Sequence, residues 1–109
     1  MEEDKLVIRR LNDELRRTGQ GGRVMITIGI QSRGPEFLSE VVTAMRRFDD
    51  FKSCDDPYGE HDFGALTVEG QSIFWKIDYY DNDLAAHSPD PADSDVTIRV
   101  LTVLLAEEY

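Results

Sequence analysis

The chain is poor in cysteine, in long apolar runs and, over its second half, in basic residues. Its single cysteine, Cys54, excludes an internal disulfide and is typical of a reducing compartment. No apolar run approaches the ~20 residues of a membrane-spanning helix. Residues 1–10 lack the basic start, apolar centre and small-residue cleavage site of a secretory signal. We therefore expect a cytoplasmic protein that has no membrane partner.

Acidic residues outnumber basic ones by 22 to 12, which gives a net charge of −10. Residues 1–47 hold nine basic and seven acidic residues, whereas residues 48–109 hold three basic and fifteen acidic residues. The second part therefore carries −12. Such a surface repels nucleic acid, because neutralisation of phosphates supplies much of the affinity for it. It attracts basic protein surfaces or cations, although solubility alone is a competing explanation.

The first half of the chain predicts a helix, a strand and a second helix. Residues 5–17 place Val7, Ile8, Leu11 and Leu15 on one helical face, and the arginines 9, 10, 16 and 17 are expected on the solvated face. Residues 18–22 are rich in glycine and predict a turn. Residues 24–30 alternate as a strand that is apolar on both faces, which favours a central or well-covered position. Residues 35–48 repeat the helical pattern after Pro35.

The second half predicts a hairpin between two acidic loops. Residues 49–62 and 81–95 read as loops, and residues 63–70 and 72–80 as strands joined by a turn at 69–71. Trp75 is the expected centre of the core, and Gly64 leaves room for an aromatic ring. Residues 96–106 are ambiguous. Their β-branched residues argue for a strand, but a helical apolar stripe and capping residues favour a helix.

These elements give the order α-β-α-β-β-α within a single domain, residues 1–109. We expect an α+β fold, a small two-layer sandwich with the helices packed on a mainly antiparallel three-stranded sheet. Hairpin geometry brings residues 60–62 close to Tyr79, Tyr80 and Asp81, so the two acidic loops meet at one end of the sheet.

Glu60, His61 and Asp62 form the cluster that comes nearest to a catalytic or metal-binding pattern. Carboxylates and an imidazole can act as general acid and base or bind a divalent ion. The chain lacks spaced His-x-x-x-His and Cys-x-x-Cys motifs, so the identity of any metal stays unknown and no cofactor is implied. A structural explanation is that His61 crosslinks its loop. The acidic neighbours of Cys54 disfavour a nucleophilic thiolate.

Two segments resemble an uncharacterised bacterial family, domain of unknown function 3768. They are Asp56-Pro57-Tyr58-Gly59-Glu60-His61-Asp62-Phe63-Gly64 and Phe74-Trp75-Lys76-Ile77-Asp78-Tyr79-Tyr80-Asp81, and the similarity extends over nearly the whole chain. The resemblance implies no catalytic residues. It does imply an association with plasmids and other mobile elements, which points to accessory or counter-defence roles.

Two hypotheses follow. In the first, the protein is an interaction module that binds a basic protein surface, in its sharpest form a DNA mimic that blocks a nucleic-acid-binding defence complex of the anti-CRISPR or anti-restriction type. The residues expected to contact the partner are Asp49, Asp50, Asp55, Asp56, Tyr58, Glu60, Asp62, Tyr80, Asp81 and Asp83. In the second, the protein is a small metal-dependent or acid/base hydrolase that uses Glu60, His61 and Asp62. Enzymatic activity is the less favoured of the two, and a homodimer is left open.

Overall fold

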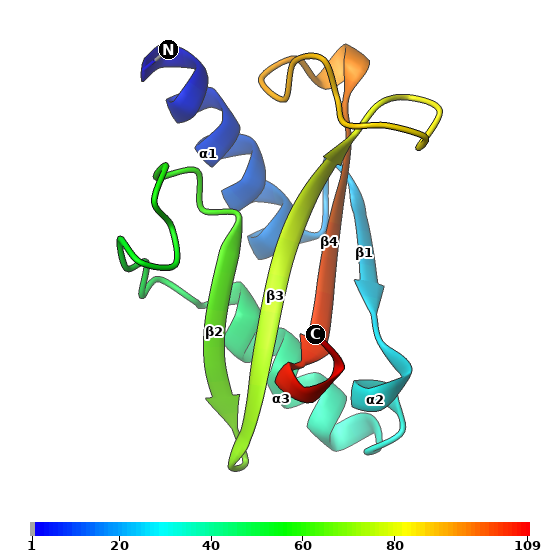
Figure 1. Cartoon of the computed structure of the whole chain (residues 1–109). Helices are drawn as coiled ribbons and strands as arrows, with labels where there is room; N and C mark the ends of the chain where they lie inside the picture. The colour runs from blue at the N-terminus through cyan, green and yellow to red at the C-terminus, as the bar shows by residue number, and fades with distance from the viewer. Residues whose placement is uncertain (1) are drawn as a thin grey trace.

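The computed structural model describes residues 2–109, which form an α+β fold (Figure 1). In chain order the elements are α1 (Glu2–Thr18), β1 (Arg23–Ile26), α2 (Ile28–Gln31), α3 (Pro35–Arg46), β2 (Phe63–Val68), β3 (Gln71–Tyr80), the 3-10 turn η1 (Ser94–Val96), β4 (Ile98–Leu105) and the 3-10 turn η2 (Ala106–Glu108). The two long predicted helices and the hairpin are confirmed. No helix among these residues is long and apolar enough to cross a bilayer.

The sheet has four strands in the order β1-β4-β3-β2, rather than the three predicted. It is mixed, because β4 runs antiparallel to β3 but parallel to β1. The helix predicted over residues 96–106 is wrong, since this segment is β4, one of the two central strands. A central strand has neighbours on both sides and is apolar on both faces. Leu101, Val103, Leu104 and Leu105 are all buried, which is why their pattern also fits a helical stripe.

The strand predicted over residues 24–30 is shorter and lies in a different place. It ends at Ile26, and it forms an edge of the sheet with Met25 56% exposed, so the expectation of a central or covered strand is wrong. The chain turns away because Glu108 binds both the Thr27 hydroxyl (2.7 Å) and the Gly29 N–H (3.2 Å). This contact joins residues about 80 positions apart and leaves no local signal in the sequence.

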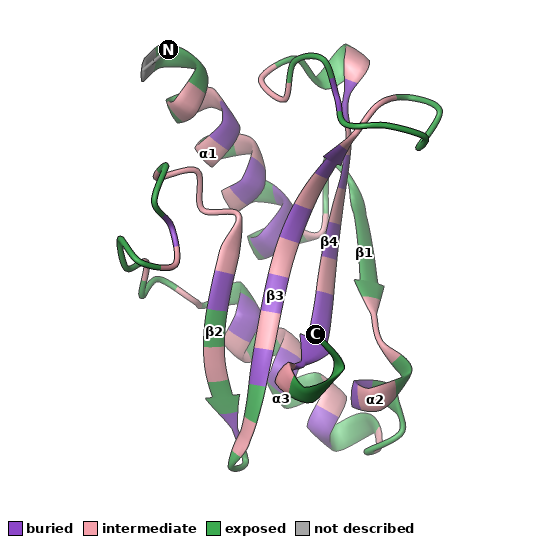
Figure 2. Cartoon of the chain, in the orientation of Figure 1, coloured by how far each residue is buried: buried purple, intermediate pink, exposed green. Residues whose placement is uncertain are grey.

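Helices α1 and α3 cover one face of the sheet, and the core lies between these helices and the sheet (Figures 1 and 2). Residues on this face of β3 are buried in strict alternation, and Trp75 is fully enclosed, as predicted. Burial of a side chain this large contributes a few kcal/mol. Gly64 is the register partner of Trp75, and a Cβ atom at this position would collide with the indole ring. The expected room for an aromatic ring at Gly64 is therefore confirmed.

The two strands of the hairpin differ in length, and this difference creates the site described below. Pairing runs from Val68 opposite Gln71 to Phe63 opposite Lys76. A two-residue turn joins the strands, with positive φ at Glu69 (49°) and Gly70 (77°), as hairpin turns of the primed types require. Residues 77–80 of β3 therefore extend beyond the start of β2, beside the two acidic loops.

Candidate functional site

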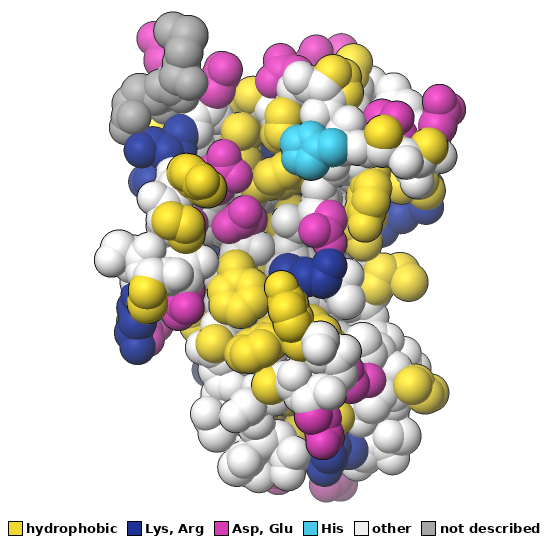
Figure 3. Space-filling model, viewed as in Figure 1, with side chains coloured by type: hydrophobic (Ala, Val, Ile, Leu, Met, Phe, Trp, Pro, Cys, Tyr) yellow, Lys and Arg dark blue, Asp and Glu magenta, His cyan; other side chains and the backbone are white. Residues whose placement is uncertain are grey.

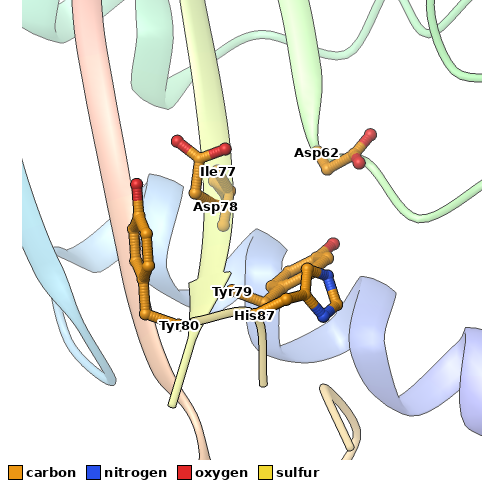
Figure 4. A pocket seen from close by; sticks show the side chains of 6 residues that line it. All are labelled: Asp62, Ile77, Asp78, Tyr79, Tyr80 and His87. Atoms are coloured by element: carbon orange, nitrogen blue, oxygen red, sulfur yellow. The ribbon is translucent and has the colours of Figure 1, made fainter. Parts of the chain in front are cut away.

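A pocket of about 290 Å³ lies at the extended end of β3 (Figure 4). The backbone of the surrounding segments holds it open. The Ile77 N–H donates to the Asp62 carbonyl (2.9 Å). Tyr80 forms an isolated antiparallel bridge with His87 in loop 81–97, the connection between β3 and β4 that includes η1. The residues that line the pocket are Asp62, Ile77, Asp78, Tyr79, Tyr80 and His87. Carboxylates and aromatic rings therefore make up most of its wall.

The Asp62 carboxylate lies in surroundings that disfavour its charge. Burial raises its pKa to about 6, and the negative charges of Glu60 and Asp56 add to this effect. The other pocket carboxylate, Asp78, is paired with Lys76 at an Oδ2–Nζ distance of 2.5 Å. Of the two pocket carboxylates, Asp78 thus has a cationic partner, whereas the surroundings of Asp62 disfavour its negative charge.

A buried hydrogen-bond network supports the pocket from beneath. Asn12 on α1 donates through Nδ2 to the Tyr79 hydroxyl (2.8 Å) and to the Glu60 carbonyl (3.1 Å). The Tyr79 hydroxyl donates in turn to Glu60 Oε1 (3.0 Å), and Arg99 Nε donates to Asn12 Oδ1 (3.0 Å). Burial raises the pKa of Tyr79 above its ordinary value, so the phenol keeps its proton and remains the donor to Glu60.

His61 attaches its loop to α1. Its backbone is left-handed (φ 58°), its N–H donates to Asp56 Oδ1 (3.1 Å), and its Nδ1 lies 2.9 Å from Asp13 Oδ1. The imidazole stacks on Phe51 with ring centroids 3.6 Å apart. Consecutive side chains therefore have different partners, since Glu60 bonds Tyr79, His61 bonds Asp13 and Asp62 lines the pocket. The geometry agrees with the crosslinking explanation for His61.

Arg16 was expected on the solvated face of α1, and this expectation is wrong because its side chain is fully buried. One guanidinium nitrogen, Nη1, donates to Asp13 Oδ1 (2.8 Å), and the group lies 5.2 Å from the Phe51 ring centroid and 5.3 Å from that of Trp75. Burial works to raise the pKa of Asp13, but hydrogen bonds from Arg16 and His61 outweigh it and lower the pKa. Arg16 thus contacts the 49–62 loop directly through the Phe51 ring, and its ion pair with Asp13 lies within α1, where Asp13 also holds His61 of the loop.

Four residues that support the pocket were not predicted from the sequence, namely Asn12, Asp13, Arg16 and Arg99. A signal existed for Asn12, which lies four residues after Ile8 and three before Leu15 and therefore on the apolar stripe of α1. A polar residue inside such a stripe is buried and needs partners. No comparable signal marked Arg99, because its segment was expected to be helical.

The ten residues expected to contact a partner differ in their exposure. Glu60 bonds Tyr79, and Asp62 lines the pocket together with Tyr79 and Tyr80, as the hairpin geometry predicted. Asp56 is buried, and Asp81 accepts hydrogen bonds from the N–H groups of Ala85 (3.0 Å) and Ala86 (3.4 Å), which lower its pKa. Four are exposed, namely Asp49, Asp50, Tyr58 and Asp83, and five are partly exposed, namely Asp55, Glu60, Asp62, Tyr80 and Asp81. Acidic side chains gather over this end of the molecule (Figure 3).

Within residues 2–109, no group of three or more His, Cys, Asp or Glu side chains has an arrangement that could hold a metal ion. No curated protein and no solved structure matches the chain. The family model described as "Protein of unknown function (DUF3768)" matches residues 26–108, and the chain therefore belongs to this family.

Proposed function

We propose that this protein is a small acidic interaction module that binds a basic protein surface at the end of the sheet where loops 49–62 and 81–97 meet. The pocket carries the proposal. Its Asp62 and Asp78 carboxylates and its Tyr80 and His87 rings match the chemistry of a guanidinium or ammonium group. An arginine or lysine side chain of the partner would occupy it, as buried anchor residues do at protein interfaces.

The electrostatics around Asp62 support the same partner chemistry. Its pKa is raised because it is buried near other carboxylates, so an incoming cation would relieve their mutual repulsion. Exposed carboxylates on the flanking loops, such as Asp49 and Asp83, would steer a basic partner toward the pocket. The −12 charge of residues 48–109 makes direct nucleic-acid binding unfavourable.

In its sharpest form, the proposal is that the protein acts in the bacterial cytoplasm as an inhibitor encoded by a mobile element. Its carboxylates would occupy the basic nucleic-acid groove of a defence complex as a DNA mimic, of the anti-CRISPR or anti-restriction type. The hydrolase hypothesis receives less support, because Glu60 bonds Tyr79 and His61 bonds Asp13, whereas Asp62 alone of the three lines the pocket.

The proposal predicts salt-sensitive capture of a basic partner that depends on the pocket. Immobilised protein is incubated with lysate of the native host at low and high salt, and captured proteins are identified and their affinities measured. We expect the double variant Asp62→Asn/Asp78→Asn to bind the partner at least about tenfold more weakly, because buried charge pairs are lost. DNA should compete with the wild-type protein if the partner surface is a nucleic-acid groove.

The matched control is Glu36→Gln/Glu40→Gln, which removes the same charge from exposed positions on α3. We expect this variant to bind within about twofold of wild type, because α3 contributes no residue to the pocket and exposed surface charges contribute little. Equal weakening by both double variants, or capture that does not change with salt, would overturn the proposal.

A further inference from the structure

The outer edge of β1 has the character of a strand that lacks a partner. β1 is an edge strand of the sheet, and three large apolar side chains on it and just beyond it are exposed, Val24 by 39%, Met25 by 56% and Ile28 by 75%. An edge strand with exposed apolar residues is a template for pairing with another chain. The acidic pocket does not include this edge.

The backbone of β1 presents hydrogen-bonding groups outward. The Thr27 N–H donates to the Val103 carbonyl (3.1 Å), so residues 23, 25 and 27 face β4, and alternation directs Val24 and Ile26 outward. The Ile26 carbonyl accepts a hydrogen bond from the exposed Gln31 side chain (2.7 Å), which leaves this oxygen a second lone pair for another donor.

We propose that a second copy of this chain pairs antiparallel with β1 about a two-fold axis at Met25. Val24 of each copy would exchange both backbone hydrogen bonds with Ile26 of the other, which are the two outward-facing residues of the strand. The two four-stranded sheets would become one continuous sheet. The inference rests on this edge and not on the basic partner proposed above.

Charge complementarity favours a second copy of this chain as the partner of β1 and favours the alignment of the two strands about Met25. With the axis at Met25, Arg23 of one copy lies opposite Thr27 of the other. The hydroxyl of Thr27 holds the Glu108 carboxylate at 2.7 Å. The exposed Arg23 side chain of each copy would therefore lie beside an acidic group of its partner, twice in the dimer.

The antiparallel arrangement also keeps the acidic ends of the two copies apart. Arg23, at the start of β1, is aligned with Val100, and Val100 is aligned with Asp78 near the pocket. The start of β1 therefore lies at the acidic end of the sheet (Figure 1). The two-fold axis directs the acidic ends of the two copies in opposite directions, which reduces repulsion between chains of charge −10.

The experiment is sedimentation equilibrium of the full chain over a range of concentrations, with variants of the edge. We expect a reversible monomer–dimer equilibrium for the wild type. Val24→Pro removes an N–H that faces outward, a position where an edge strand tolerates proline, and should abolish the dimer. Circular dichroism checks that this variant folds.

Charge variants provide an arm that does not depend on proline. Arg23→Glu should raise the dimer dissociation constant about tenfold, because it faces Glu108 of the partner with a like charge. Arg10→Glu, the same change at an exposed position of α1, should leave the constant within about twofold of wild type. Tyr109→Ser tests the open face of the sheet, where Tyr109 packs edge-on against Phe74.

Three results would overturn the proposal. The first is a monomer at every concentration that can be reached. The second is a dimer that both edge variants leave intact. The third is a dimer lost in Tyr109→Ser but kept in folded Val24→Pro, which would place the contact on the open face.

Discussion

Asn12 contacts three chain segments that are distant in the sequence, through Glu60, Tyr79 and Arg99. At the scale of single residues, such buried polar side chains attach the 49–62 loop to α1 and to the sheet. His61 and Arg16 add a second attachment through Asp13. These bonds fix the backbone on both sides of Asp62 and leave its side chain to line the pocket.

The raised pKa of Asp62 predicts that its charge destabilises the folded protein at neutral pH. A carboxyl group whose pKa is raised from 3.8 to about 6 binds its proton more tightly in the folded state. The resulting penalty is absent below about pH 4, grows as the pH rises and is complete above about pH 6. Asp62→Asn should therefore raise the free energy of unfolding at pH 7 by about 1–2 kcal/mol, allowing for solvent screening.

Urea unfolding between pH 4 and pH 8 measures this effect. The gain from Asp62→Asn should disappear near pH 4, where the wild-type carboxyl is protonated as well. Asp83→Asn removes the same charge from an exposed loop position and should stay within about 0.5 kcal/mol of wild type. A loss of stability in Asp62→Asn at pH 7 would contradict the assignment.

At the scale of elements, the pairing of β2 with β3 positions the pocket. The register is fixed by the two-residue turn and by alternation of buried side chains on β3. Gly64 allows this register, because the Trp75 indole fills the space where a side chain would lie. The helices contribute by covering the Trp75 side of the sheet.

Gly64→Ala should destabilise the protein by about 1–3 kcal/mol, because the added methyl group overpacks the core against Trp75. Chemical unfolding followed by Trp75 fluorescence measures the change, since this is the single tryptophan. Ala65→Ser, at the exposed neighbouring position, should change stability by less than about 0.5 kcal/mol. Equal effects of the two substitutions would argue against close packing at Gly64.

At the scale of the whole molecule, an excess of acidic side chains dominates the electrostatic field. The chain has twenty-two acidic and twelve basic residues. Acidic side chains gather where the two loops meet (Figure 3). Self-repulsion of this kind opposes the compact state and is screened by salt. The same field would steer a basic partner to the pocket.

We therefore expect thermal stability at pH 7 to rise with sodium chloride between about 0.01 and 0.5 M, over which the Debye length falls from about 30 Å to only a few ångströms. The melting temperature should increase by several degrees, and calorimetry measures it. Sucrose at the same osmolality separates charge screening from a general exclusion effect. A melting temperature that falls with added salt would show that attractive ion pairs outweigh the repulsion.

Local sequence patterns were sufficient to predict α1, α3 and the hairpin. Apolar spacing identified α1 and α3, alternation and turn residues identified the hairpin, and the hairpin placed Glu60 and Asp62 near Tyr79 and Tyr80. Composition showed the acidic second half, and the quoted motifs identified the family. The helices and the hairpin could be predicted because their patterns are formed by residues close together in the sequence.

The positions of β4, β1 and Arg16 depend on contacts between distant parts of the chain and could not be predicted from local patterns. β4 is a strand because it has neighbours on both sides, whereas its apolar run fits a helix equally well when read alone. β1 ends at Ile26 because Glu108, from the other end of the chain, holds Thr27 and Gly29. Arg16 is buried because Asp13 and two aromatic rings compensate its charge. Such contacts depend on side chains that the chain brings together only when it folds.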